Sequence, residues 1–296
     1  PRQTKHDRSP VTVADFAVQA VVAQHLAESL GAIQLVAEED SRSLRGPDGP
    51  PMLAEIVRQV RRILPDAQPE QVLAWIDWGG GRPGPDFWTL DPIDGTKGFL
   101  RGGQYALALA RIERGRVTLA GLACPQLVVT PLGEAPGVLA IAARGAGAWA
   151  QPLDGGPWIR LRASGIDDPA QARWLRSVEG AHTDEAWLDR LVADLGIVHE
   201  PVRMDSQAKY VVVAAGDGDL IFRLLPSGDR SFRERIWDQA AAALLVEEAG
   251  GRISDLMGAV LDFGAGPLLE RNLGVLTSNG LLHDRVLAAL RRVPQA

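Results

Sequence analysis

The segment from residue 105 to residue 153 consists of apolar runs separated by short turns that contain glycine. The sequence "RGR" at 114–116 joins one pair of runs, and "RGAG" at 144–147 joins the next pair. Apolar runs of this length between tight turns are typical of neighbouring antiparallel strands. We therefore expect an antiparallel sheet in this part of the chain.

Helices and a second unit are expected on either side of that sheet. Apolar residues recur at helical spacing in 13–30 and in 52–64, whereas the shorter run 72–77 is interpreted as a strand. Beyond a polar joint near residue 162, strand and helix patterns alternate. The sequence thus predicts an α+β protein, with an N-terminal antiparallel sheet and helices in 1–162 and a C-terminal α/β part in 163–296.

Composition and charge exclude several classes of protein. The chain of 296 residues is 46% hydrophobic, enough for a substantial core, but its apolar runs are too short to cross a bilayer. Its formal net charge is −6 and no long basic stripe is present, which argues against nucleic-acid binding. A single cysteine, Cys124, cannot form an internal disulfide, and the N-terminus lacks an apolar signal core. These features favour a reducing, cytoplasmic location.

Two like charges stand close together in "LDPIDGT", which contains Asp91 and Asp94. Neighbouring carboxylates repel each other unless a cation binds between them, and Mg²⁺ prefers such oxygen ligands together with phosphate oxygens. The carbonyl of Ile93 could serve as a further ligand. Gly95 permits a turn after the acids, and backbone amides from Gly95 and Thr96 onward would present a positive helix end to an anion.

Further acids occur in similar settings elsewhere. Glu38 follows an apolar run, Asp15 precedes a helical pattern, and Asp238 stands before "QAAAALLVEEAGG". Each has an ordinary structural interpretation, because helix caps and strand ends often carry carboxylates. Taken singly, none of these acids indicates a function.

Their joint arrangement resembles a known family. Six segments occur in order between Ser9 and Asn279: "SPVTVAD", "VAEED", "WTLDPIDGTKGFLRGGQYALALA", "VEGAH", "DSQAKY" and "IWDQAAAALLVEEAGG". They resemble the signatures of the lithium-sensitive, magnesium-dependent phosphatases related to inositol monophosphatase. Within that superfamily, "SPVT" and "DGTKGFLRG" resemble the 3′(2′),5′-bisphosphate nucleotidases. The resemblance implies a layered αβαβα sandwich.

The resemblance also implies roles for individual residues. It assigns one Mg²⁺ to Glu38, Asp91 and the Ile93 carbonyl, and a second Mg²⁺ to Asp91, Asp94 and Asp238. A third ion would bind more weakly near Glu38. Asp15 and Thr96 match the pair that orients the attacking water, and the amides of Gly95 and Thr96 match the phosphate-binding groups.

Four residues match positions that contact the nucleotide: His182, Ser206, Lys209 and Arg223. Without the resemblance, His182 would be interpreted as a loop residue and Lys209 as a surface lysine beside a buried strand or helix. Members of these families usually carry an amphipathic helix ahead of the first motif, so we expect the present sequence to lack that helix.

The implied activity is Mg²⁺-dependent removal of the 3′-phosphate of adenosine 3′,5′-bisphosphate, with the sulfated analogue as a second substrate and lithium as an inhibitor. The implied partner is a phosphorylated nucleotide, with no nucleic acid and no membrane, bound by a monomer or homodimer. One alternative is an inositol phosphatase, against which "KGFLRG" counts. Another is a catalytically silent metal or nucleotide-binding regulator, against which the complete set of site residues counts.

Overall fold

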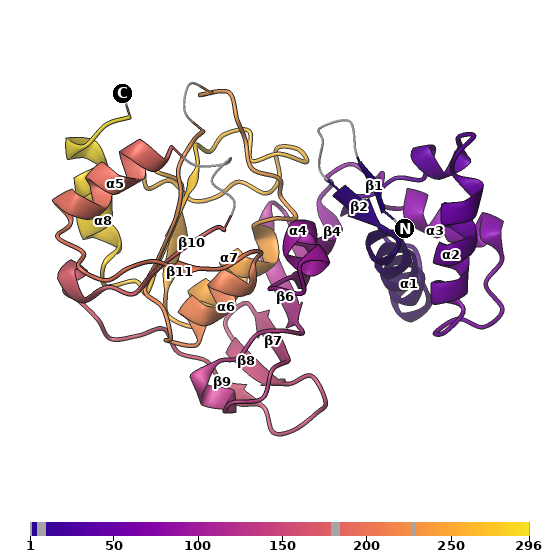
Figure 1. Ribbon diagram of the computed structural model, residues 1–296, viewed down its shortest axis with the longest axis horizontal. Coiled ribbons are helices and arrows are strands. Elements are labelled where there is room, and N and C mark those ends of the chain that lie inside the picture. Colours follow the sequence, from indigo (N-terminus) through magenta and orange to yellow (C-terminus); the bar gives the residue numbers. More distant parts are fainter. Residues whose placement is uncertain (1, 5–9, 179–183, 227–228, 296) are drawn as a thin grey trace.

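The computed structural model describes residues 2–4, 10–178, 184–226 and 229–295. Its elements form five layers (Figure 1). Helices α1 (Val13–Leu30), α2 (Pro50–Val60) and α3 (Pro69–Asp77) lie at one end, against a seven-stranded sheet. Helices α6 (Ala208–Ala214) and α7 (Ala240–Glu248) separate this sheet from a five-stranded sheet. Helices α5 (Glu185–Asp194) and α8 (His283–Arg292) form the last layer. The expected αβαβα sandwich is confirmed.

The seven-stranded sheet has the order β3-β4-β5-β6-β7-β8-β9. Its strands are β3 (Leu35–Ala37), β4 (Asp86–Asp94), β5 (Ala106–Glu113), β6 (Arg116–Cys124), β7 (Val138–Ala143), β8 (Gly147–Pro152) and β9 (Ile159–Arg160). All neighbours pair antiparallel except β3 and β4, which are parallel. Between β5 and β6 the chain turns through Arg114 and Gly115, both with positive φ. The antiparallel arrangement expected for residues 105–153 is therefore present.

The five-stranded sheet has the order β11-β10-β12-β14-β13 and mixes parallel with antiparallel pairs. Its strands are β10 (Trp174–Arg176), β11 (Val202–Arg203), β12 (Leu220–Arg223), β13 (Arg252–Ser254) and β14 (Val275–Ser278). Smaller elements are the pair β1 (Arg2–Thr4) and β2 (Pro10–Thr12), helix α4 (Thr96–Leu100), and the 3₁₀ turns Arg42–Arg45, Thr130–Leu132 and Pro169–Gln171.

The strand predicted for residues 72–77 was wrong, because this segment lies in helix α3. Pro69 occupies the first turn, and Gln68 and Gln71 form a reciprocal capping box that starts the helix. The buried residues Val72, Leu73 and Ile76 follow helical rather than alternating spacing. These helix-start residues lie at the beginning of the segment, and their effect outweighs the β-like composition of residues 72–77.

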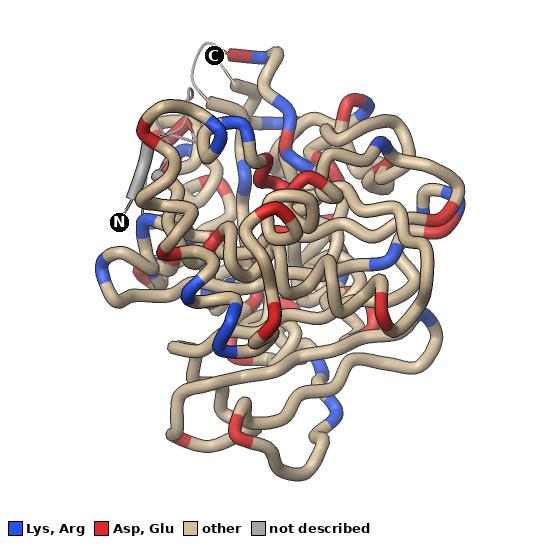
Figure 2. The backbone as a smooth tube through the Cα atoms, turned by 90° about the vertical axis from the view of Figure 1, so that its right-hand side faces the viewer, with Lys and Arg blue, Asp and Glu red and all other residues tan. Residues whose placement is uncertain are grey.

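The largest hydrophobic cluster lies between the seven-stranded sheet and helices α6 and α7. It contains residues from both sides of residue 162, from Val36 to Val275. The segment that connects the two sheets runs from β9 to β10, and the boundary at residue 162, which stays a prediction, falls within it. Basic and acidic positions are interleaved along the chain (Figure 2). Among the described helices, none combines the length and apolar character that a membrane span requires.

Candidate active site

The parallel pairing of β3 with β4 places Glu38 close to Asp91. Ala37, the last residue of β3, pairs with Leu90 of β4, so Glu38 leaves the sheet beside Asp91, which is still part of β4. Glu38 is half-buried there, and Asp91 is buried. Strand register thus brings together two acids that are 53 positions apart in sequence.

A β-bulge brings the two acids of "DPID" to one side of β4. In a regular strand, side chains three positions apart point to opposite faces. Here Asp91 pairs with Ala108 and Asp94 with Ala106, so β4 has one more residue than β5 in this interval. The extra residue shifts the alternation by one position and turns both carboxylates toward the same face.

Asp91 has an environment that is unfavourable for a negative charge. Its exposed fraction is 2%, and its Oδ1 atom has no hydrogen-bond partner in the described part of the chain. Burial raises the pKa of Asp91 well above its usual value, and the carboxylates of four further acids raise it as well: Glu38, Asp94, Asp238 and Asp15. The predicted acids are therefore close enough to repel one another.

Asp94 is held from the C-terminal half of the chain. The backbone N–H of Gln207 donates a hydrogen bond of 2.5 Å to its Oδ2 atom. Burial raises the pKa of Asp94, and the positive charges of Lys209 and Arg223 oppose that rise. Gly95 follows with φ of 85°, and a Cβ atom at this position would lie 2.9 Å from the Cβ of Ser206. Glycine is therefore required both for the turn and for the close contact.

Asp15 and Thr96 lie within hydrogen-bond distance of each other, and their role in orienting water stays a prediction. The N–H and hydroxyl of Thr12 donate hydrogen bonds of 2.8 and 2.7 Å to Oδ2 of Asp15. The Thr96 hydroxyl lies 3.3 Å from Oδ1 of the same carboxylate and 3.1 Å from the carbonyl oxygen of Ile93. Thr12, at the N-cap of α1, thus fixes one oxygen of Asp15 and directs the other toward Thr96.

Asp238 comes from the C-terminal half of the chain, just ahead of helix α7, and interacts electrostatically with Asp91 and Asp94. Burial raises its pKa well above the usual value, and the nearby charge of Asp94 raises it further. Within the described residues, no group of three or more His, Cys, Asp or Glu side chains is arranged to enclose a metal ion by itself. Mg²⁺ is usually held by one or two carboxylates together with water and phosphate oxygens, so a full protein cage is not needed.

Three of the four residues predicted to contact the nucleotide, Ser206, Lys209 and Arg223, lie beside these acids. Ser206 has φ of 65° and is 9% exposed. Lys209 is 2% exposed, and its Nζ atom donates to the carbonyl oxygens of Met204 and Ser206. Arg223 forms two hydrogen bonds, of 2.9 and 2.7 Å, with the carboxylate of Glu234. Their contact with a substrate stays a prediction, and His182 lies outside the described residues.

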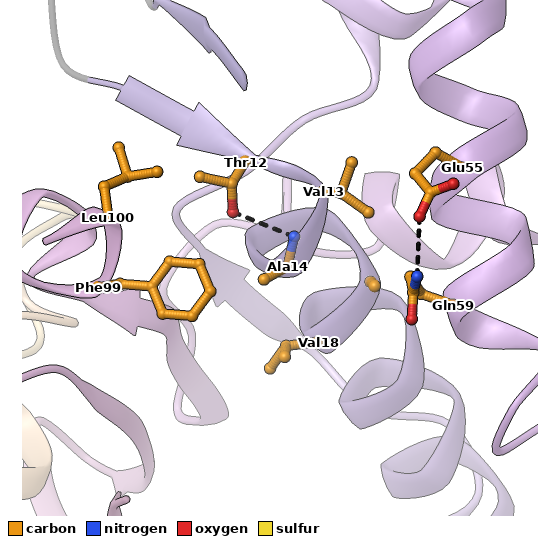
Figure 3. A pocket seen from close by; sticks show the side chains of 9 residues that line it. Thr12, Val13, Ala14, Val18, Glu55, Gln59, Phe99 and Leu100 are labelled. Atoms are coloured by element: carbon orange, nitrogen blue, oxygen red, sulfur yellow. Dashed lines mark hydrogen bonds between the residues drawn. The ribbon is translucent and has the colours of Figure 1, made fainter. Parts of the chain in front are cut away.

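A pocket of about 600 Å³ lies next to the acids, between α1, α2 and α4. Figure 3 shows Phe99 and Leu100 on one side of this pocket and Glu55 and Gln59 on the other. Its lining is mostly apolar and includes Thr12 but none of the predicted site residues. The acid cluster, rather than this pocket, therefore contains the chemically reactive groups.

Two residues of the site were missed in the sequence. Thr12 belongs to the pattern T-x-x-D, which is a recognisable capping signal, although its role in orienting Asp15 was not anticipated. Gln207 stands inside the segment "DSQAKY", where only Ser206 and Lys209 were singled out. Cys124 is fully buried, as expected for a small apolar residue, and burial raises the pKa of its thiol.

Comparisons with known proteins show which family this chain resembles. The model of the inositol monophosphatase family matches residues 2–295. A 3′(2′),5′-bisphosphate nucleotidase of Oryza sativa is 39% identical over 309 residues, which cover 98% of this chain and 86% of the rice protein.

Solved structures show the same fold. A staphylococcal inositol monophosphatase in a LiCl-soaked inhibitory complex has a TM-score of 0.64 at 21% identity, covering 98% of this chain and 85% of its own. An inositol monophosphatase/NADP phosphatase complexed with Mg²⁺ and phosphate has a TM-score of 0.63 at 21% identity, with the same coverage. The chain belongs to the inositol monophosphatase family.

Proposed function

We propose that this chain is a Mg²⁺-dependent phosphatase that removes the 3′-phosphate of adenosine 3′,5′-bisphosphate and leaves AMP. The observation that carries the proposal is Asp91, a buried carboxylate with an unsatisfied oxygen among other acids, next to the Asp15–Thr96 pair. A structural carboxylate would have donors around it, whereas this one is arranged for a cation. The name of the rice relative supports the choice of substrate class.

The residues present fit Mg²⁺. Asp91 would bridge two ions, the first held with Glu38 and the Ile93 carbonyl, and the second held with Asp94 and Asp238. When bound, the ions neutralise the phosphate charge and increase the acidity of a coordinated water. A third, weaker ion near Glu38 would account for inhibition by lithium.

Thr96 and Asp15 would prepare the attacking water. The Thr96 oxygen can accept a hydrogen bond from water while its own proton points to Asp15, 3.3 Å away. Because Thr12 already fixes the other oxygen of Asp15, the carboxylate cannot rotate away from Thr96. Asp15 and Thr96 would thereby orient the water toward the phosphorus atom and favour loss of a proton from that water.

Substrate binding would use the turn after the acids and the facing segment of the C-terminal half. The amides of Gly95 and Thr96 would hold the transferred phosphate, as the start of α4 places them beside Asp94. Ser206, Lys209, Arg223 and His182 would contact the remaining nucleotide. Lys209 and Arg223 already act on Asp94 electrostatically, so an anionic substrate would find positive charge on that side.

The test is phosphate release from adenosine 3′,5′-bisphosphate, its sulfated analogue and inositol phosphates, each with millimolar Mg²⁺. We expect the highest kcat/KM for the bisphosphate, activity on the sulfated analogue, and inhibition by LiCl. Thr96→Ala should lower kcat by about 100-fold or more, whereas Thr96→Ser, which keeps the hydroxyl, should lose far less. No release from the bisphosphate, or a higher kcat/KM for an inositol phosphate, would contradict the proposal.

A further inference from the structure

Gln207 connects the two carboxylates that the proposed second cation would use. It stands at the N-cap of α6 and is 1% exposed. Its backbone N–H donates to Oδ2 of Asp94 at 2.5 Å. Its side-chain Nε2 donates to the carbonyl oxygen of Trp237, the residue before Asp238, at 3.1 Å. One buried residue therefore links the end of β4 with the start of the α7 segment.

The orientation of the Gln207 amide follows from its partners. A carbonyl oxygen can only accept, so the nitrogen of the amide must face Trp237 and the oxygen must point elsewhere. That oxygen, Oε1, is buried and has no partner among the residues that the structure describes. An unsatisfied buried acceptor destabilises the fold. The backbone N–H of the same residue donates to Asp94, so the amide belongs to a residue that contacts the acid site.

The backbone around Gln207 is rigidly held. Ser206 has a positive φ, and its carbonyl and that of Met204 both accept hydrogen bonds from the buried Lys209. Asp205 forms a salt bridge of 2.5 Å with Arg101, which follows α4. The contact between Gly95 and Ser206 closes the remaining space. Because these contacts hold the backbone, the two hydrogen bonds of Gln207 keep Asp94 and Trp237 at a defined separation.

We propose that Gln207 is a positioning residue that sets the separation of Asp94 from Asp238 and thereby the affinity for the cation between them. The inference rests on the proposed function for the identity of that cation as Mg²⁺. In the absence of this tether, two carboxylates that repel each other would move apart, because they come from different layers of the fold.

The test is the variant Gln207→Met, which keeps the length of the side chain and removes both polar atoms. Direct binding of Mn²⁺ to the protein without substrate should be measured by electron paramagnetic resonance, together with the Mg²⁺ dependence of phosphate release. We expect Mn²⁺ affinity at one site to fall about tenfold and the half-activating Mg²⁺ concentration to rise about tenfold.

The matched control is Asn279→Leu. Asn279 is also a buried amide that ties two segments, since its Nδ2 atom donates to Ser164 Oγ and to the Ile166 carbonyl, but it belongs to the C-terminal sheet. Its loss should lower the melting temperature and leave Mn²⁺ affinity unchanged. Gln207→Asn serves as a second variant: its backbone N–H still donates to Asp94, but its amide is one carbon too short to reach the Trp237 carbonyl, so it should also weaken Mn²⁺ binding.

Either Gln207 variant with wild-type Mn²⁺ affinity would overturn the inference, as would an equal loss of affinity in Asn279→Leu. Failure of the wild-type protein to bind Mn²⁺ would overturn it too. If Mn²⁺ affinity falls in the Gln207 variants as expected but the wild-type protein does not hydrolyse adenosine 3′,5′-bisphosphate, the positioning role is supported and the proposed substrate is wrong.

Discussion

Asp91 lies within β4 of the seven-stranded sheet and Asp219 just ahead of β12 of the five-stranded sheet; both are buried aspartates, and their surroundings are opposite. Asp219 accepts hydrogen bonds from the Arg173 backbone, from its guanidinium at 2.9 Å, and from the Ser164 hydroxyl. Asp91 has one oxygen without any donor in the described chain and is surrounded by other carboxylates. Both are nearly inaccessible, with exposed fractions of 0% and 2%.

The difference separates two reasons for burying a charge. A carboxylate with a full set of donors stabilises the fold, and removing it leaves those donors without a partner. A carboxylate among like charges destabilises the fold until a cation binds. In the absence of a cation, substitution to asparagine should therefore raise the stability of the fold at Asp91 and lower it at Asp219.

The largest expected effect comes from Asp91→Asn. Because Asp91 would bridge both ions, this variant should lose at least about 1,000-fold in Mg²⁺-dependent phosphate release. The same substitution removes a buried charge from an acid cluster, so the melting temperature in EDTA should rise. The two readouts are a phosphate assay and thermal unfolding by circular dichroism. A stable, fully active Asp91→Asn would refute the assignment of Asp91 to a cation site.

Asp219→Asn should do the reverse. The amide of asparagine offers one acceptor oxygen where the carboxylate offers two, so donors of Arg173 would be left without an acceptor and the free energy of unfolding should fall by about 2 kcal/mol. At a temperature where the variant remains folded, kcat and Mg²⁺ dependence should match the wild type. Urea unfolding gives the stability. If Asp219→Asn changed the Mg²⁺ dependence at least as much as the Gln207 variants do, Asp219 could not be distinguished from the proposed cation-binding acids.

The sequence predicted the parts of this site that depend on local pattern. Helix α1 has the predicted bounds, 13–30, and the hairpin of β5 and β6 forms at its glycine turn. The acids of "DPID" and Thr96 lie within a few residues of one another, so their proximity is local as well. Such features need only short-range chemistry, which one sequence contains.

The remaining features arise from tertiary register. The bulge in β4 exists only relative to β5, and the hydrogen bond from Gln207 to Asp94 spans 113 positions. Without the family resemblance, Lys209 would be interpreted as a surface lysine. It is buried, and its Nζ atom donates hydrogen bonds to two backbone carbonyls of the preceding loop. No local pattern encodes these contacts, and α3 was mistaken for a strand for a related reason, since only its flanking cap reveals the helix.

The polar core around β13 and β14 should respond to pH. His283 is fully buried between the hydroxyls of Ser254 and Ser278, and burial lowers its pKa from 6.5 to about 4, helped by the charge of Arg252 and opposed by that of Asp284. As pH falls below 6.5, the unfolded chain takes up the proton first, so the fold loses stability. From pH 7 to pH 5 the loss should be about 2 kcal/mol.

Urea unfolding at both pH values measures this loss, and His283→Gln is the control because it cannot titrate. An equal pH dependence in the variant would assign the effect to other groups. The stability carried by His283 is fully present above pH 6.5 and disappears toward pH 4, which distinguishes it from a group with a raised pKa.

The smallest expected effect is the rise in melting temperature on adding Mg²⁺, and it should differ between Asp91→Asn and Asp219→Asn. An ion that binds only the folded chain stabilises it by about 1.4 kcal/mol at ten times its dissociation constant. For a chain of this size, that corresponds to a rise in melting temperature of about 3 °C. Wild type and Asp219→Asn should show the same increment, because the donors around Asp219 are unaffected by a cation at the other sheet. Asp91→Asn should show none, since the carboxylate that the ions share is gone. An equal increment in all three proteins would place the cation away from Asp91 and remove the physical reason for its buried charge.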